Sequence, residues 1–185
     1  MINFNLLPAN LPKPQDDGQA NHLVGLHLPN IELPSTNGEI INVSLLKNWV
    51  VLYCYPMTGQ PDVPLPKGWD EIPGARGCTP QSCSYRDHYQ ELKQLNAEVF
   101  GISTQPTDYQ REMVGRLHLP FNVLSDNLRF FQTALNLPTF EVQNMILLKR
   151  LTLIAHHGVI KKIHYPVFPS NTDAQWVIEF LTSTK

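Results

Sequence analysis

The sequence is poor in charge and in cysteine, and it has no long apolar run. Charged residues make up 16% of its 185 residues and the formal net charge is −2, so it lacks the basic surface that nucleic-acid binding requires. No apolar run approaches the roughly 18 residues that suggest a membrane span. The start, MINFNLLPANLPKPQDDG, lacks the basic residues and apolar core of a secretion signal. We therefore expect a cytoplasmic protein that binds neither nucleic acid nor membrane.

What the sequence does contain is enough apolar residues for one core. The hydrophobic fraction is 42%, which is too high for a disordered chain, and the length suits a single domain. Residues 1–22 are rich in Pro, Asn and Asp and are expected to form an N-terminal tail. Residues 23–185 are expected to form the domain.

The order of the expected elements indicates the fold class. Apolar and β-branched patterns predict strands at 28–33, 39–43, 50–55, 98–103, 121–125, 144–155 and 159–165. Helices are expected from about Pro80 through the apolar stripe at 85–95, and at 108–118, 127–136 and 172–181, the last one capped by Asn171. This βαβαβ–ββα order requires parallel strands first and a hairpin later. It predicts an α/β fold, a thioredoxin-like three-layer sandwich with a central mixed sheet and an N-terminal β extension.

A long stretch without expected regular structure precedes the helix at Pro80. Residues 56–77, PMTGQPDVPLPKGWDEIPGARG, contain five prolines and four glycines. Loops of this length are uncommon and are often functional. Trp69 inside this loop is expected either to pack it against the domain or to cover a pocket or partner site.

The three cysteines differ in their surroundings. Cys54 lies within the apolar run VVLYCY and is expected to be a small buried hydrophobe. Cys78 lies just before Pro80, a residue suited to the first turn of a helix. Free N–H groups and the positive end of the helix dipole favour a thiolate there, and Arg76 and Arg86 add positive charge. Cys78 is therefore the candidate reactive cysteine.

Cys83 has several possible roles. It could condense with an oxidised Cys78 to form a disulfide, or it could only pack the helix. Cys78, Cys83 and His88 form C-x4-C-x4-H, which is not a usual zinc spacing and has no fourth ligand nearby. The C-x-x-C motif of thioredoxin-type reductases is absent. We expect no metal and no organic cofactor.

The segment GCTPQSCSYRDHY resembles the active-site segment of peroxiredoxins, specifically the bacterioferritin-comigratory or Q-type branch. VVLYCYP, EVFGIST, LPFNVLSD and KRLTLIAHHGVIKKIHYPVFP resemble further segments of that family in the same order. The resemblance covers about residues 22–182. It implies a thiol peroxidase on a thioredoxin fold.

The resemblance also implies roles for individual residues. Cys78 matches the peroxidatic cysteine, Cys83 the resolving cysteine, and Arg150 the arginine that holds thiolate and peroxide. The implied substrates are hydrogen peroxide and alkyl hydroperoxides, and the implied reductant is a thioredoxin-like dithiol that reopens an intramolecular disulfide. A monomer and a homodimer both stay open. The alternatives are a thiol–disulfide oxidoreductase and a redox-sensing protein on the same fold.

One departure from the family motif concerns its threonine. The motif has threonine three residues before the peroxidatic cysteine, where this sequence has Ala75. Residues 57–77 separate Pro56 from Cys78, a much longer interval than in the motif. Thr58 and Thr79 are the two candidates for the missing hydroxyl.

Overall fold

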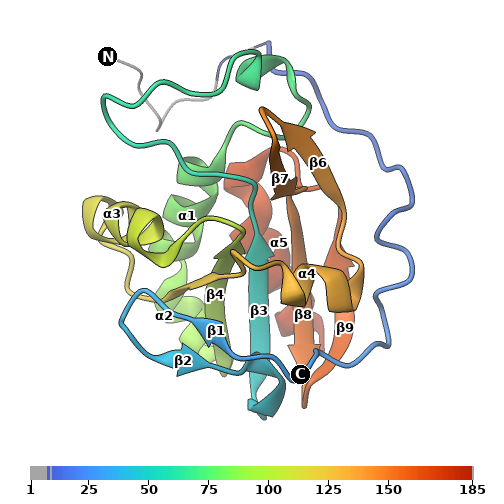
Figure 1. The fold of residues 1–185 in the computed structure, drawn as a ribbon. Coiled ribbons are helices and arrows are strands. Elements are labelled where there is room, and N and C mark those ends of the chain that lie inside the picture. The colour runs from blue at the N-terminus through green and yellow to red at the C-terminus, as the bar shows by residue number, and fades with distance from the viewer. Residues whose placement is uncertain (1–7, 9, 185) are drawn as a thin grey trace.

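Strand β3 (Trp49–Cys54) lies at the centre of a five-stranded sheet (Figure 1). The computed structural model describes residue 8 and residues 10–184, so residues 1–7 and 9 of the expected tail, and residue 185, lie outside the described residues. The strand order is β5 (Val123–Ser125), β4 (Ala97–Ser103), β3, β8 (Leu151–His156) and β9 (Val159–His164). β3, β4 and β5 are parallel, and β8 is antiparallel to β3 and to β9. The expected mixed sheet is confirmed.

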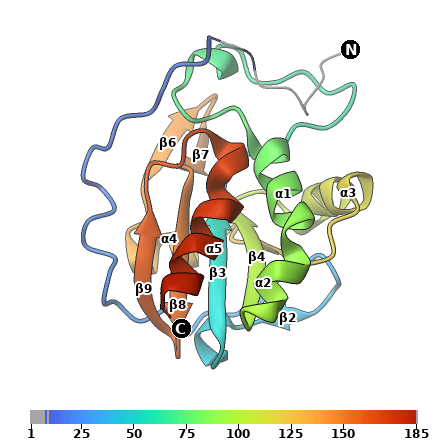
Figure 2. The same ribbon diagram turned by 180° about the vertical axis from the view of Figure 1, so that it is seen from behind.

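Both faces of the sheet are covered, which gives the expected three layers. Helices α1 (Cys78–Asp87), α2 (Tyr89–Gln94), α3 (Thr107–Leu117) and α5 (Asp173–Ser183) pack on one side of the sheet (Figure 2). The other face is covered by α4 (Phe130–Leu135) and by apolar residues of the segment 20–46. Because successive side chains of a strand point to opposite faces, Val51 and Tyr53 face the first set, while Val50 and Leu52 face the second.

The N-terminal β extension is shorter than expected. Strands β1 (Leu33–Pro34) and β2 (Ile40–Ile41) pair across a turn. Most of the expected strand at 28–33 is irregular, since Pro29 cannot donate to a ladder; the N–H of Leu28 bonds instead to the carbonyl of Gly158. Farther toward the N-terminus, Asp17 lies 2.6 Å from the ammonium group of Lys149.

The prediction of one strand over 144–155 is wrong. Two strands occupy this run: β7 (Met145–Leu148), which pairs with the unexpected strand β6 (Thr139–Val142), and β8, which begins at Leu151. Gln143 and Asn144 join β6 to β7 with φ of 47° and 64°, the left-handed conformation that two-residue hairpin turns need. The chain leaves the strand conformation at Lys149 and Arg150, and this break sends the Arg150 side chain into the interior.

Several expected helix ends are also corrected. The helix expected at 127–136 begins only at Phe130, because the Asp126 carboxylate accepts the N–H groups of Phe131 and Gln132. The predicted cap Asn171 is wrong, because it lies in a 3-10 turn, η3 (Ser170–Thr172), and α5 begins at Asp173. The helix that starts near Pro80 divides at His88, which bonds through Nδ1 to the carbonyl of Ser84.

Gly101 packs tightly in the core, and this packing generates a stability prediction. A Cβ added to Gly101 of β4 would lie 2.7 Å from Cζ and Oη of Tyr53, a buried ring stacked on Tyr85. Gly101→Ala is therefore expected to lower the free energy of unfolding by about 1–3 kcal/mol. Gly115→Ala is the control, because that site in α3 has nothing within 4 Å; it should gain up to about 1 kcal/mol. Urea unfolding measures both, and equal stabilities would contradict this account of the core.

Candidate active site

Cys78 is the first residue of α1, at the end of the loop 56–77. Gly77 precedes it with φ of 113°, a conformation that glycine adopts without strain. Pro80 lies in the first turn, where its missing N–H costs nothing. The side chain of Cys78 is buried with only 4% exposed, so its sulfur meets the helix dipole away from bulk water.

Arg150 brings its guanidinium to this sulfur from the break between β7 and β8. Its Nη2 lies 3.2 Å from Cys78 Sγ. The carbonyl oxygens of Gly74, Ala75 and Arg76 lie 3.2, 3.1 and 3.3 Å from the same nitrogen and share its two N–H groups with the sulfur. Arg150 is only 3% exposed, and a guanidinium keeps its charge when buried. It can therefore stabilise a thiolate and also hold the loop end.

A glutamine and an aspartate extend this arrangement. Arg150 Nη1 donates to Gln81 Oε1, and Gln81 Nε2 donates to Asp173 Oδ2 at 2.7 Å. The sequence interpretation missed both residues. Gln81 could have been found, since it lies three positions after Cys78 and so on the same face of the helix. Asp173 is 92 residues from Gln81 in sequence, and no local pattern indicates its place.

A small cavity lies against Cys78. Its volume is about 20 Å³, and it is lined by Met57, Gly59, Leu65, Trp69, Arg76, Gly77, Cys78 and Thr79. A cavity of this size holds about one water molecule, so it disfavours bulky substrates. Of the two threonine candidates, Thr79 lines the cavity and Thr58 does not. The Thr58 hydroxyl points to the carbonyl of Gly59 at 3.4 Å, and its main chain bonds to Gln105.

The loop 56–77 forms its own apolar cluster over the hairpin of β6 and β7. Trp69, Ala75 and Leu147 are its buried members, and the rings of Trp69 and Phe140 are 6.1 Å apart. Figure 1 shows this loop at the top of the molecule, beside that hairpin and the start of α1. Trp69 both packs the loop down and lines the cavity of Cys78, so the two expected roles are combined in one side chain.

The other two cysteines lie apart from the cavity, and all three thiols are free. Cys83 is half-buried on α1; burial raises the pKa of its thiol, and the nearby Arg86 opposes that rise. Arg86 thus lies close enough to Cys83 to favour its thiolate, an effect that the sequence interpretation did not assign to it. Cys54 is fully buried in β3, and burial strongly raises the pKa of its thiol, as suits a packing residue.

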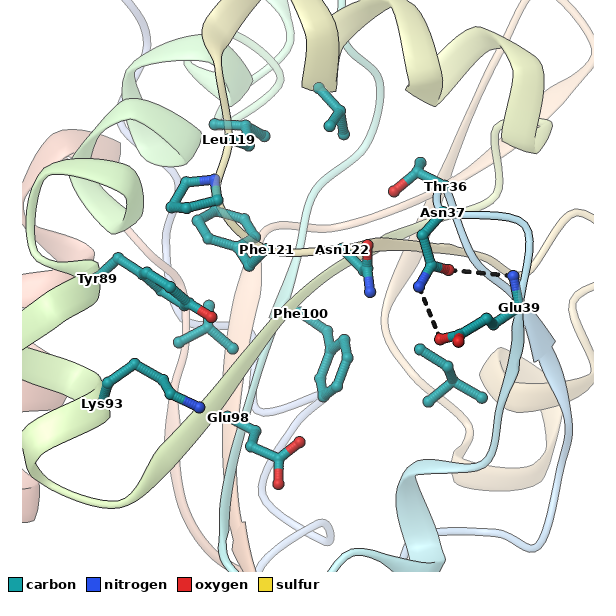
Figure 3. Close-up of a pocket in the computed structure, with 14 residues that line it drawn as sticks. Thr36, Asn37, Glu39, Tyr89, Lys93, Glu98, Phe100, Leu119, Phe121 and Asn122 are labelled. Atoms are coloured by element: carbon teal, nitrogen blue, oxygen red, sulfur yellow. Dashed lines mark hydrogen bonds between the residues drawn. The ribbon is translucent and has the colours of Figure 1, made fainter.

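A separate hollow of about 490 Å³ lies beside the first half of β4, at residues 98–100 (Figure 3). Tyr89, Lys93, Glu98, Phe100 and Phe121 are among its lining residues, and none of the predicted site residues is. Within residues 8 and 10–184, no cluster of three or more His, Cys, Asp or Glu side chains is placed to hold a metal. No helix in that part of the chain is long and apolar enough to cross a membrane.

Comparisons with known proteins identify relatives among the peroxiredoxins. The chain is 34% identical over 126 residues to peroxiredoxin Q, chloroplastic, of rice (Oryza sativa subsp. japonica), which covers 64% of this chain and 51% of the rice protein. It is 28% identical over 123 residues to peroxiredoxin bcp1 of Schizosaccharomyces pombe, covering 64% and 55%. The chain thus spans about half the length of these curated relatives.

Solved structures show the same fold. Peroxidoxin BcpB of Mycobacterium tuberculosis superposes with a TM-score of 0.72 at 22% identity, covering 88% of this chain and 97% of the other. The bacterioferritin comigratory protein of Xanthomonas campestris gives 0.70 at 17%, covering 86% and 97%. Residues 23–178 match the family described as Redoxin. The chain belongs to the redoxin family, and its similarity lies with the Q-type, bacterioferritin-comigratory peroxiredoxins.

Proposed function

We propose that the chain is a thiol peroxidase that reduces hydrogen peroxide and organic hydroperoxides. The observation that carries this proposal is the 3.2 Å contact between Arg150 Nη2 and Cys78 Sγ at a helix start, beside a cavity. The names of the similar proteins support it. The Cys78 thiolate attacks one peroxide oxygen, the O–O bond breaks, and the sulfur becomes a sulfenic acid. The leaving alkoxide or hydroxide takes up a proton.

Arg150 and the first N–H groups of α1 supply the electrostatic part of this step. Negative charge moves from sulfur to the leaving oxygen, and a fixed guanidinium can donate to both without reorganising. An apolar wall of Met57, Leu65 and Trp69 keeps bulk water from the reacting atoms. Such exclusion strengthens each interaction of the charge inside the cavity.

Recycling requires that α1 opens. Cys78 and Cys83 lie in one helix, and five residues of regular helix climb about 7.5 Å and turn a net of about 140°. A disulfide needs Cα atoms within about 7 Å and converging side chains. We infer that the first turn unwinds, so that Cys83 attacks the sulfenic sulfur, displaces water and forms the disulfide.

An external dithiol of the thioredoxin type then restores both thiols by exchange. Thiol chemistry of this kind needs a reducing compartment, and we retain the cytoplasm as the expected location. The rice relative is named chloroplastic. No metal or organic cofactor enters the cycle.

An assay with thioredoxin, its reductase and NADPH tests the activity. We expect multiple turnovers with hydrogen peroxide and slower turnover with cumene hydroperoxide, because the cavity of about 20 Å³ must widen for a bulky group.

Arg150→Lys should fold but react with peroxide about 100-fold more slowly, since lysine lacks the planar pair of donors. A wild-type rate in that variant would show that Arg150 only supports the fold.

The two threonines can be distinguished by matched variants. Thr79→Val is expected to slow the reaction with hydrogen peroxide about tenfold, because Thr79 is the candidate threonine that lines the cavity and valine lacks its hydroxyl. Thr58→Val should change the rate less than twofold, because its side chain faces Gly59. Stopped-flow rates of the two reduced variants with hydrogen peroxide distinguish the threonines. A larger loss of rate in Thr58→Val than in Thr79→Val would assign the role of the motif hydroxyl to Thr58.

The opening of α1 generates a further prediction. Cys83→Ser should still form a sulfenic acid at Cys78, but it should stop there and over-oxidise with excess peroxide. Oxidised wild-type protein should lose amide-exchange protection across residues 78–86 relative to reduced protein. The unwinding idea fails if protection is equal in both states while mass spectrometry confirms the disulfide.

A further inference from the structure

Asp173 is a carboxylate with no exposed surface at the start of α5. Burying such a group costs free energy unless its oxygens are hydrogen-bonded. Four side chains donate to it: Gln81 Nε2 at 2.7 Å, Tyr85 Oη at 2.9 Å, Thr152 Oγ1 at 2.7 Å and His164 Nδ1 at 2.8 Å. Four donors on one buried carboxylate fix its position closely.

A continuous run of hydrogen bonds leads from this carboxylate to Cys78. A carboxylate only accepts and a guanidinium only donates, whereas an amide has one end of each kind. Gln81 must therefore present its nitrogen to Asp173 and its oxygen to Arg150, which is the arrangement observed. Reversing the amide would break both bonds at once, so its orientation is determined from both sides.

The charges complete the argument. Arg150 is almost fully buried, and within the described residues no carboxylate oxygen lies within 4 Å of it. The side-chain amide of Gln81 bridges the guanidinium to Asp173, which is the nearest negative group along this run of hydrogen bonds. His164 is the basic side chain in direct contact with Asp173, at 2.8 Å. The attraction between Asp173 and Arg150 is weaker than a direct ion pair, but burial makes it stronger than it would be in water.

We propose that Asp173 is a positioning residue of the peroxidase site, acting through Gln81 to hold the Arg150 guanidinium against the Cys78 sulfur. This inference rests on the roles proposed above for Cys78 and Arg150. A purely structural role, in which Asp173 only ties α5 to Tyr85 and Thr152, would affect stability alone. A positioning role also affects the reaction of a folded protein.

The first test replaces Asp173 by asparagine. Asp173→Asn keeps the shape but removes the charge, so Gln81 Nε2 meets a neutral carbonyl oxygen, which is a weaker acceptor than the carboxylate. We expect the second-order rate of Cys78 with hydrogen peroxide to fall about tenfold, measured by stopped-flow tryptophan fluorescence, since Trp69 lines the cavity. Asp126→Asn is the matched control: it removes another buried carboxylate, which caps α4, and should lose stability with a rate within twofold of wild type.

A rescue separates positioning from stability. Adding Gln81→Glu to Asp173→Asn moves the carboxylate one residue along the run, where it can accept from Arg150 and from the new amide. The double variant should recover most of the lost rate, although it restores no contact of α5 with Tyr85 or Thr152. If Asp173→Asn fails to fold, Gln81→Met cuts the same run and should show the same tenfold loss.

Two results would overturn the inference. One is a folded Asp173→Asn or Gln81→Met variant that reacts at the wild-type rate. The other is a folded double variant that is no faster than the single one. The proposed function is judged separately, by the wild-type rate and by its loss in Cys78→Ser, so a failure of either idea is recognisable.

Discussion

The buried guanidinium of Arg150 is the group on which the site depends. An ionised side chain in the interior is costly unless its donors are used. Here they reach the carbonyls of residues 74–76, the Gln81 amide and the Cys78 sulfur. The loop end runs directly into the first turn of α1, whereas the break before β8 lies 69 residues beyond Gln81. Arg150 ties these two parts of the chain together. The same contacts satisfy the buried charge and provide the geometry that the proposed reaction needs.

The sequence predicted those features that depend on local pattern. Buried strands such as β3 were readable because every residue is apolar, and Cys78 at a helix start was readable from Pro80. The break between β7 and β8 at Lys149 and Arg150 could not be predicted, since apolar residues flank this pair and one continuous strand fits them equally well. β6 was missed because its residues are only partly buried. Gln81 and Asp173 meet across 92 residues, and such a pairing leaves no periodic trace.

The presence of Ala75 where the peroxiredoxin motif has threonine is compatible with the contacts of Arg150. Ala75 has no hydroxyl, but its carbonyl accepts from Arg150, as do the carbonyls on either side of it. Main-chain groups can be supplied by any residue type, so the loop end can hold the arginine whatever stands at position 75. The long insertion before it buries Trp69 and Ala75 against Leu147. Its apolar packing provides the rigidity that a shorter loop would obtain from its length.

The contact between Arg150 and Cys78 also bears on when α1 opens. A hydrogen bond to an ionised partner is roughly twice as strong as a neutral one. In the reaction we propose, the sulfur is negative before peroxide attack and neutral as a sulfenic acid afterwards. The guanidinium thus holds the first turn most strongly while the thiolate is present, and less strongly once it has reacted. Chemistry at the sulfur itself lowers the cost of unwinding, so that Cys83 gains access after oxidation and not before it.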